Sequence, residues 1–326
     1  MSKKQIKILD KEIKSLSDFI ETFELDLKCE YKNKDIRLYF RGEKELFEEP
    51  CVPSLFRKTK TDFANLKEDE IYYRILRRQI EDFEGLSNLD ILAKMQHYGF
   101  PTRLLDITTN PLIALFFALQ ESEKNDGYVY IFRAKHERSK EKDEKNILPY
   151  DSDRALLIST LPKLSDEQRD HIREYCEKYP NQLIYPSVLS EKKIDESPIS
   201  DNEPMRKALG KFIYECERER HAFHQNHRVN PADLVKIYFA KSRFSNERLK
   251  AQEGLFMLFG LGIHEYNDEI IGIKIPYCFK KKMKAELFFF TGITSSRVFQ
   301  GLEALAYDNK DELYSELLKT EEDLER

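Results

Sequence analysis

The sequence predicts an α+β fold in which helices flank a mixed β-sheet and one long segment inserts further helices. In some segments apolar residues are spaced by three and four among charges, which is typical of helices. These segments alternate along the chain with short runs that have a period of two or are apolar on both faces, which is typical of strands. The strand-like runs occur before about residue 133 and after about residue 233. Between them, about residues 134–230 are charged and helical in pattern, which indicates a helical insertion.

The first elements are expected to be helices followed by a strand. Apolar residues recur at mostly three- and four-residue spacing from residue 8 to 30, which predicts one or two amphipathic helices within residues 1–32. At 36–41 the period falls to two, which places Arg41 on the polar side of a half-buried strand that ends there, and Gly42 follows. Helices are then expected at 67–86 and 89–98, the second capped by Gly99.

Caps and apolar runs predict the later elements. Asn110 and Pro111 mark a helix start, and the apolar run after them predicts a buried helix through residue 119. Residues 127–132 are apolar on both faces, which suits a central strand. We expect a single domain over residues 1–326. Its remaining elements are expected to be helices at 166–179 and 204–224, strands at 234–239, 254–259 and 269–275, a short helix at 246–251, and helices from about 279 to 326.

The composition predicts a soluble globular protein. Apolar residues make up 40% of the 326 residues, which is enough for a core although 35% of the residues are charged. The longest apolar run, 111–119, is far shorter than the roughly 20 residues of a membrane helix, and the first residues do not form the core of a signal peptide. We therefore expect a cytoplasmic protein with no membrane partner.

The sequence gives little support for a metal site or for binding to nucleic acid. The five cysteines are scattered without a Cys-x-x-Cys pair, and His221, His224 and His227 fit no standard zinc spacing, so no metal is expected. The net charge of -5 gives no overall attraction to nucleic acid. One basic patch leaves a nucleic-acid-acting protein open as an alternative, although charge on a helix face more often serves solvation. This patch consists of Lys280, Lys281, Lys282 and Lys284.

Two motifs place polar groups at tight turns beside apolar segments, the arrangement by which a rigid scaffold presents a small-ligand site. One is Phe40-Arg41-Gly42, and the other runs from Gln96 to Asp106. Together with Asn110-Pro111 and the later segment Arg248-x-x-Ala251-Gln252-x-Gly254, they resemble the FRG domain family, which is named for the Phe-Arg-Gly triplet. The resemblance extends to about residue 306. Many members of this family lack an assigned activity, and several occur in bacterial or phage-related contexts.

The sequence departs from the family pattern at two positions. Ile107 stands where tryptophan is frequent, and Glu43 stands where glutamine is frequent. Both departures are modest, so they leave the resemblance intact.

The order of these elements is also similar to that of NAD-dependent ADP-ribosyltransferases, which implies a split sheet and NAD as a substrate. In that fold an arginine or histidine on the first strand holds the ribose or phosphate side of NAD, and a late glutamate or glutamine bonds the ribose. Breaking the nicotinamide–ribose bond places positive charge on the sugar, so the reaction favours a carboxylate near that carbon and a guanidinium near the pyrophosphate. The resemblance implies catalytic roles for Arg41, Gln252 and Glu253, and binding roles for Arg41, Gly42, His97, Tyr98, Thr102, Arg103 and Thr108.

Simpler roles stay open for several of these side chains. Arg41 alternatively ends an edge strand in a surface ion pair. His97 either bonds locally or holds a ribose hydroxyl or phosphate, and Tyr98 either packs in the core or stacks on a ring. Arg103 is expected to pair with Asp106 and brace the corner rather than to bind a ligand.

Two adjacent residues late in the chain are alternative candidates for one position in the site. Gln252 and Glu253 are adjacent and point in opposite directions if the chain is extended, so only one is expected to reach the site. The family pattern favours Gln252, whereas the chemistry favours Glu253.

The leading hypothesis is an NAD-dependent ADP-ribosyltransferase-like or NAD-cleaving protein, with a defence or toxin role by family association. Its partners would be a nucleotide ligand, an unidentified protein or nucleic-acid acceptor, and an inhibitor or sensor protein. The first alternative is a non-catalytic nucleotide-sensing or protein-interaction module that uses the same cleft. The second is the nucleic-acid-acting protein already mentioned.

Overall fold

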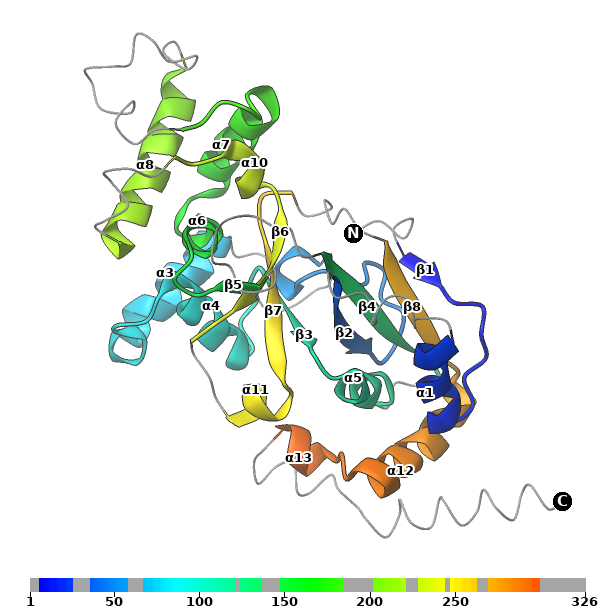
Figure 1. Ribbon diagram of the computed structural model, residues 1–326. Helices are drawn as coiled ribbons and strands as arrows, with labels where there is room; N and C mark the ends of the chain where they lie inside the picture. The colour runs from blue at the N-terminus through cyan, green and yellow to red at the C-terminus, as the bar shows by residue number, and fades with distance from the viewer. Residues whose placement is uncertain are drawn as a thin grey trace, which may run out of the picture.

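The described residues form an α+β fold around one mixed sheet of eight strands (Figure 1). The computed structural model describes residues 6–25, 36–57, 67–120, 124–135, 147–184, 202–220, 228–243, 247–262 and 269–299. Only the two edge pairs, β1 with β8 and β5 with β6, are parallel, so the predicted α+β class with a mixed sheet is confirmed. From edge to edge the strands are β1 (Ile6–Ile8), β8 (Ile270–Ile275), β4 (Gly127–Lys135), β2 (Ile36–Glu43), β3 (Leu104–Thr108), β7 (Gly254–Phe259), β6 (Ile237–Lys241) and β5 (Ile147–Pro149).

The sheet is nearly divided between β2 and β3. Strand β2 pairs with β4 from Ile36 to Glu43, but it pairs with β3 only where Phe40 lies opposite Thr108. Strand β3 pairs fully with β7 on its other side. The two halves of the sheet therefore separate along a line that we call the β2–β3 seam.

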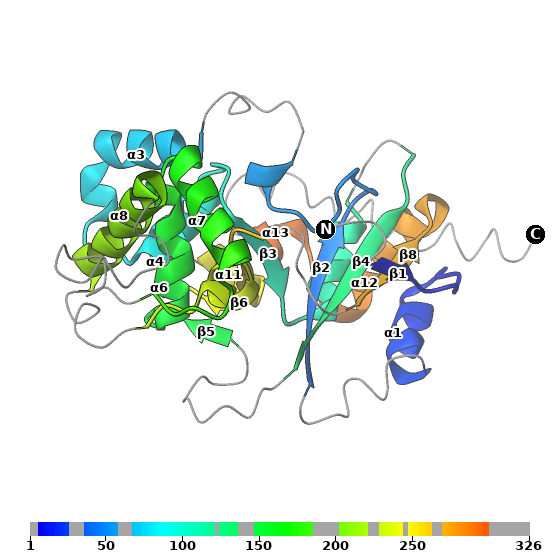
Figure 2. The ribbon, with the colours of Figure 1, turned by 90° about the horizontal axis from the view of Figure 1, so that it is seen from above.

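Helices pack against both halves. Below the β2-β4-β8 half in Figure 1 lie α1 (Leu16–Leu25), α5 (Pro111–Ala118) and α12 (Lys280–Thr291), with α13 (Ser295–Phe299) beside them. Beside the other half, Figure 2 shows a separate group of helices, and their apolar side chains join those of β7 in one large cluster. This group contains α3 (Glu68–Arg78), α4 (Asn88–His97), α6 (Asp153–Thr160), α7 (Asp166–Lys178), α8 (Glu203–Glu219) and α10 (Pro231–Leu234).

Local signals account for many of the boundaries. As predicted, the Asn110 side chain accepts a hydrogen bond from the backbone N–H of Leu112 at 2.9 Å, and Pro111 opens α5. Ser87 caps α4 in the same way, and Gly99 takes the positive φ of 83° that ends it.

The structure corrects four expectations about local structure. Residues 6–8 form an edge strand rather than a helix, because they pair with β8. Strand β2 continues past Arg41, and both Tyr39 and Glu43 on its predicted polar side are buried. Residues 104–108 form β3 rather than a corner, and residues 147–149 form β5 within the predicted helical insertion. The predicted segments at 221–227 and beyond 299 lie outside the described residues.

Candidate functional site

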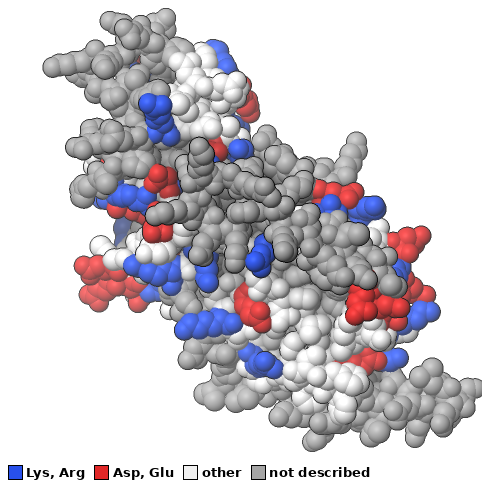
Figure 3. All heavy atoms as spheres, in the orientation of Figure 1, with Lys and Arg blue, Asp and Glu red and all other residues white. Residues whose placement is uncertain are grey.

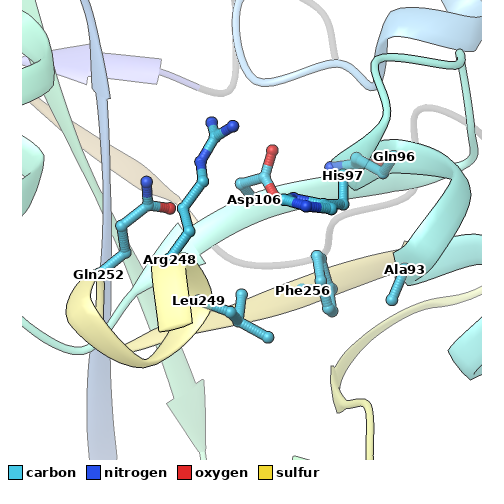
Figure 4. Close-up of a pocket in the computed structure, with 8 residues that line it drawn as sticks. All are labelled: Ala93, Gln96, His97, Asp106, Arg248, Leu249, Gln252 and Phe256. Carbon is cyan, nitrogen blue, oxygen red and sulfur yellow. The ribbon is translucent and has the colours of Figure 1, made fainter. Parts of the chain in front are cut away.

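A small pocket lies on one side of the β2–β3 seam, between α4, β3, α11 (Glu247–Ala251) and β7. Its volume is about 50 Å³. It joins two motifs that are far apart in the sequence, because α11 leads directly into β7 and β7 pairs with β3. The residues that line it are Ala93, Gln96, His97, Asp106, Arg248, Leu249, Gln252 and Phe256 (Figure 4).

The turn between α4 and β3 is fixed by Thr102. This residue is buried, and its hydroxyl donates to the Gln96 side chain while it accepts the backbone N–H of Leu104 at 3.2 Å. Thr102 therefore holds the pocket's two walls, α4 and β3, at a fixed spacing. Its role is to position His97 and Asp106, which carry the polar groups of those walls.

The polar groups in the pocket are complementary in charge. In Figure 4 the Asp106 carboxylate lies between the Arg248 side chain and the His97 ring. Burial, followed by the positive charge of Arg248, lowers the pKa of His97. The ring is therefore neutral at pH 7, so it can donate one hydrogen bond and accept another.

Gln252 supplies an amide to the same pocket. Its Nε2 donates to the backbone carbonyl of Val298 in α13 at 3.3 Å, and its side chain is almost fully buried. The amide oxygen remains for the pocket, and Figure 4 shows it on the side of Arg248. Thus α13 orients the amide that the pocket presents.

Arg41 spans the β2–β3 seam. Its Nε donates to Oε1 of Glu43 at 2.9 Å, and its Nη1 donates to the backbone carbonyl of Asp106 at 2.7 Å. No hydrogen bond among the described residues uses Nη2, and 16% of the side chain is exposed. Burial by itself would lower the pKa of Arg41, but the Glu43 carboxylate raises it, so the group is a permanent cation. An oriented guanidinium with unused N–H groups is suited to bind an anion.

Glu43 is the site carboxylate that the sequence patterns do not identify. Its Oε1 accepts from Arg41 and from the backbone N–H of Cys51 at 3.3 Å, and it lies 3.9 Å from Nη2 of Arg57. Its buried Oε2 has no hydrogen-bond partner among the described residues, and neither does the buried hydroxyl of Tyr130. A water molecule or a ligand group would supply the partners that this acceptor and this donor lack.

Comparison with known families identifies part of this architecture. Residues 36–127 match the family model of the FRG domain. The chain contains an FRG domain. No curated protein and no solved structure matches the chain. The match runs from β2 through α5 to the start of β4, so Arg41, His97 and Asp106 belong to the FRG domain, whereas Arg248 and Gln252 come from the chain that follows it.

The glycine of the FRG triplet packs against α5. A Cβ atom at Gly42 would lie 1.8 Å from the carbonyl oxygen of Ala114 and 2.8 Å from the backbone nitrogen of Ala118. Glycine is therefore required for α5 to lie directly on β2. This contact occupies the face of Gly42 opposite to the one that carries Arg41 and Glu43.

Two further predicted residues brace the turn before β7. Thr108 donates to the backbone carbonyl of Gln252 at 2.7 Å and accepts the backbone N–H of Asn110 at 3.0 Å. Glu253 has a φ of 46° and accepts the side-chain amide of Asn110 at 2.9 Å. Of the adjacent pair, Gln252 lines the pocket and Glu253 holds the start of α5.

Arg103 lies in the core of the FRG domain, and it does not pair with Asp106. Its Nε donates to Glu68 at 2.8 Å, a second nitrogen binds the other oxygen of the same carboxylate, and Nη1 donates to the carbonyl of Phe259 at 2.7 Å. The expected pair of Arg103 with Asp106 is thus wrong, because the planar guanidinium instead binds Glu68, a carboxylate that is distant in sequence. Tyr98, in contrast, is 62% exposed, and its ring centre lies 5.1 Å from that of His97.

The basic patch predicted from Lys280 to Lys284 lacks its first member. Lys280 is buried, and its ammonium donates to the carbonyl of Lys44 at 2.6 Å. On the face drawn in Figure 3, the described Lys and Arg side chains are interspersed with Asp and Glu. Among the described residues, no cluster of His, Cys, Asp or Glu is suited to hold a metal, and no helix has the length and apolarity needed to span a bilayer.

Proposed function

We propose that this FRG-domain protein binds NAD at the β2–β3 seam and cleaves its nicotinamide–ribose bond, passing ADP-ribose to an acceptor or to water. One observation carries the proposal. Arg41 is held by Glu43 and by the Asp106 carbonyl so that one guanidinium nitrogen is not used by the described residues. The same Asp106 presents its side chain to the pocket of His97 and Arg248. Cationic groups suited to a pyrophosphate, from β2 and α11, thus flank the strand that carries a carboxylate suited to a developing cation.

The roles follow from the charge changes of the reaction. When the C–N bond breaks, its electron pair leaves with the nicotinamide nitrogen, and positive charge develops on the ribose. The Asp106 carboxylate stabilises that charge, and Arg41 and Arg248 bind the pyrophosphate oxygens. The attacking hydroxyl forms the new bond to the ribose carbon and gives its proton to His97, whose lowered pKa keeps the ring neutral and ready to accept.

The size of the pocket favours a second candidate as well. A volume of about 50 Å³ is far below the ~300–1,000 Å³ of most small-molecule sites, so it takes one group of a nucleotide while the remainder lies outside. A module that binds a nucleotide without turnover needs no more than this. A defence or toxin role and an inhibitor partner remain predictions from family association.

The test uses NAD labelled on the nicotinamide or on the adenosine, with and without cell lysate. Asp106→Asn keeps the shape of the side chain and removes its charge, so we expect nicotinamide release to fall about 100-fold while binding persists. Arg248→Ala should weaken binding about tenfold. Glu81→Gln, at an exposed site outside the pocket, is the matched control.

The outcomes separate the candidates. Binding without nicotinamide release from the wild type, in lysate and in buffer, supports the binding module and rejects the enzyme. Absence of both binding and release rejects both readings. Label transfer that survives nuclease but not protease treatment of the lysate identifies a protein acceptor, and the reverse identifies a nucleic acid.

A further inference from the structure

A second and much larger cavity lies among the helices beside the β3-β7 half of the sheet. Its volume is about 570 Å³, within the ~300–1,000 Å³ range of small-molecule sites. It is bounded by α3, by the start of α4, by the end of α8 and by the turn that precedes α6. It shares no lining residue with the pocket at the seam.

The wall of this cavity holds an ammonium group that forms no hydrogen bond with the described part of the chain. The Lys163 side chain is only 14% exposed, and its Nζ lies 3.9 Å from Oε2 of Glu215 and 3.9 Å from Oε2 of Glu219. No hydrogen bond among the described residues uses this nitrogen, although an ammonium has three donors. The ammonium lines the cavity and its donors are not used by hydrogen bonds among the described residues, so it is placed to bind an acceptor from outside the chain.

Glu219 gives the cavity an acceptor next to that donor. Its Oε1 accepts the backbone N–H of Asn88 at the start of α4, at 2.9 Å. Among the described residues, its Oε2 has only the distant contact with Lys163. A donor and an acceptor side by side suit adjacent hydroxyl groups, each of which both donates and accepts, as in the 2′,3′-diol of a ribose.

Aromatic rings and exposed cations complete the lining. Tyr73 and Tyr150 are partly buried at the cavity, and Arg243 lies 5.1 Å from the centre of the Tyr150 ring. The side chains of Arg218 and Arg243 are 61% and 52% exposed, and their ion pairs with Glu215 and Asp90 are long, at 3.6 Å and 3.5 Å. Nη2 of Arg243 also donates to the Gly85 carbonyl at 3.0 Å. Tyrosine rings offer stacking surfaces to a base, and exposed guanidinium groups offer donors to a phosphate.

We propose that this cavity is a second small-molecule site and that it binds a nucleoside monophosphate. The ribose hydroxyls bind Lys163 and Glu219, the base packs against the tyrosines, and the phosphate lies at the rim with Arg218 and Arg243. The proposal is independent of NAD cleavage at the seam.

The test is calorimetric titration of the full chain with AMP, GMP, CMP and UMP, with the four matching nucleosides, and with inorganic phosphate. We expect at least one monophosphate to bind at one site per chain, and its nucleoside to bind about tenfold more weakly. The double variant Arg218→Ala, Arg243→Ala should reduce the affinity for the monophosphate to that for the nucleoside and leave the nucleoside affinity unchanged. Arg74→Ala, Arg78→Ala removes the same charge from exposed positions of α3 outside the cavity and should have no effect.

Asp106→Asn separates the two sites, because it should leave monophosphate binding unchanged whether or not NAD is cleaved. Failure of all four monophosphates to bind the wild type overturns the proposal. So does binding that the rim variant preserves and Asp106→Asn abolishes, because that binding would occur at the seam. The rim side chains are exposed, so the variant tests binding without removing a buried charge.

Discussion

Replacing Gly42 by alanine tests what the glycine of the Phe-Arg-Gly triplet does. The new Cβ would lie 1.8 Å from the Ala114 carbonyl oxygen, whereas such contacts are essentially never shorter than 3.0 Å. The neighbouring atoms belong to the backbone of α5, so no side-chain rotation relieves the overlap. Helix α5 must move away from β2 and give up part of its packing against Phe40 and Val129.

The expected cost is at the upper end of that for overpacked cores. Such substitutions typically cost 1–3 kcal/mol through strain, and the rigid neighbours here place Gly42→Ala at about 3 kcal/mol or more in the free energy of unfolding. Urea denaturation followed by far-UV circular dichroism measures it. Gly210→Ala is the matched control, because Gly210 lies inside α8 with nothing within 4 Å of a new Cβ. That change should stabilise the protein by about 0.5–1 kcal/mol.

Two results would refute this reasoning. If Gly42→Ala unfolds at the same urea concentration as the wild type, α5 does not lie against β2 as closely as described. If the variant keeps its stability and loses NAD binding, the glycine serves the ligand through its backbone, as the resemblance to ADP-ribosyltransferases implies. We expect instead that stability and binding fall together.

Three further changes give separate expectations. The pKa of His97 should rise towards its ordinary value in Arg248→Ala, because one of the two causes that lower it is removed. An NMR titration of the ring protons, assigned with His97→Ala, measures this pKa. An unchanged titration midpoint would contradict the expectation. Glu68→Gln should lower the free energy of unfolding by about 3–5 kcal/mol, because it leaves the buried guanidinium of Arg103 partly unpaired, and a loss below about 1 kcal/mol in urea would disprove that role. Glu43→Gln should lower stability by about 1–3 kcal/mol and tighten the binding of pyrophosphate, because the guanidinium groups beside it lose their counter-charge. Calorimetry that finds weaker binding would contradict the last expectation.

The elements predicted correctly are those with local signals. Asn110 and Pro111 define the start of α5, and Gly99 ends α4, because caps depend on a few adjacent residues. Strand β3 was missed because its five residues lie between a Gly-Phe-Pro turn and a helix cap, and Asp106 interrupts their apolar pattern. Only pairing with β7 and the seam makes this segment a strand, and such pairing is not local.

The candidate site was predictable to a similar extent. The motif residues His97 and Gln252 do line one pocket, and both were identified from the sequence. Arg248 belongs to the motif quoted from the sequence, but its role depends on the fold, which places α11 and α4 around one pocket. Glu43 was missed because Gly42 suggested the end of a strand, whereas Gly42 pairs with Val129 and β2 continues. The ion pair of Arg103 with Glu68 could not be predicted from the sequence, since Glu68 is distant along the chain.

The seam also determines how the role of Arg41 must be tested. Because β2 and β3 pair at only one position, the Asp106 carbonyl has no backbone partner in β2, and the side chain of Arg41 takes the place of the missing strand hydrogen bond. Arg41→Ala therefore removes a structural bond and a ligand-binding cation together, and its loss of activity would not separate them. The backbone carbonyl of Asp106 is unchanged in Asp106→Asn, so that variant keeps the seam closed by Arg41 while it removes the carboxylate. A loss of NAD cleavage with unchanged stability in Asp106→Asn therefore reports on the chemistry of the seam and not on its architecture.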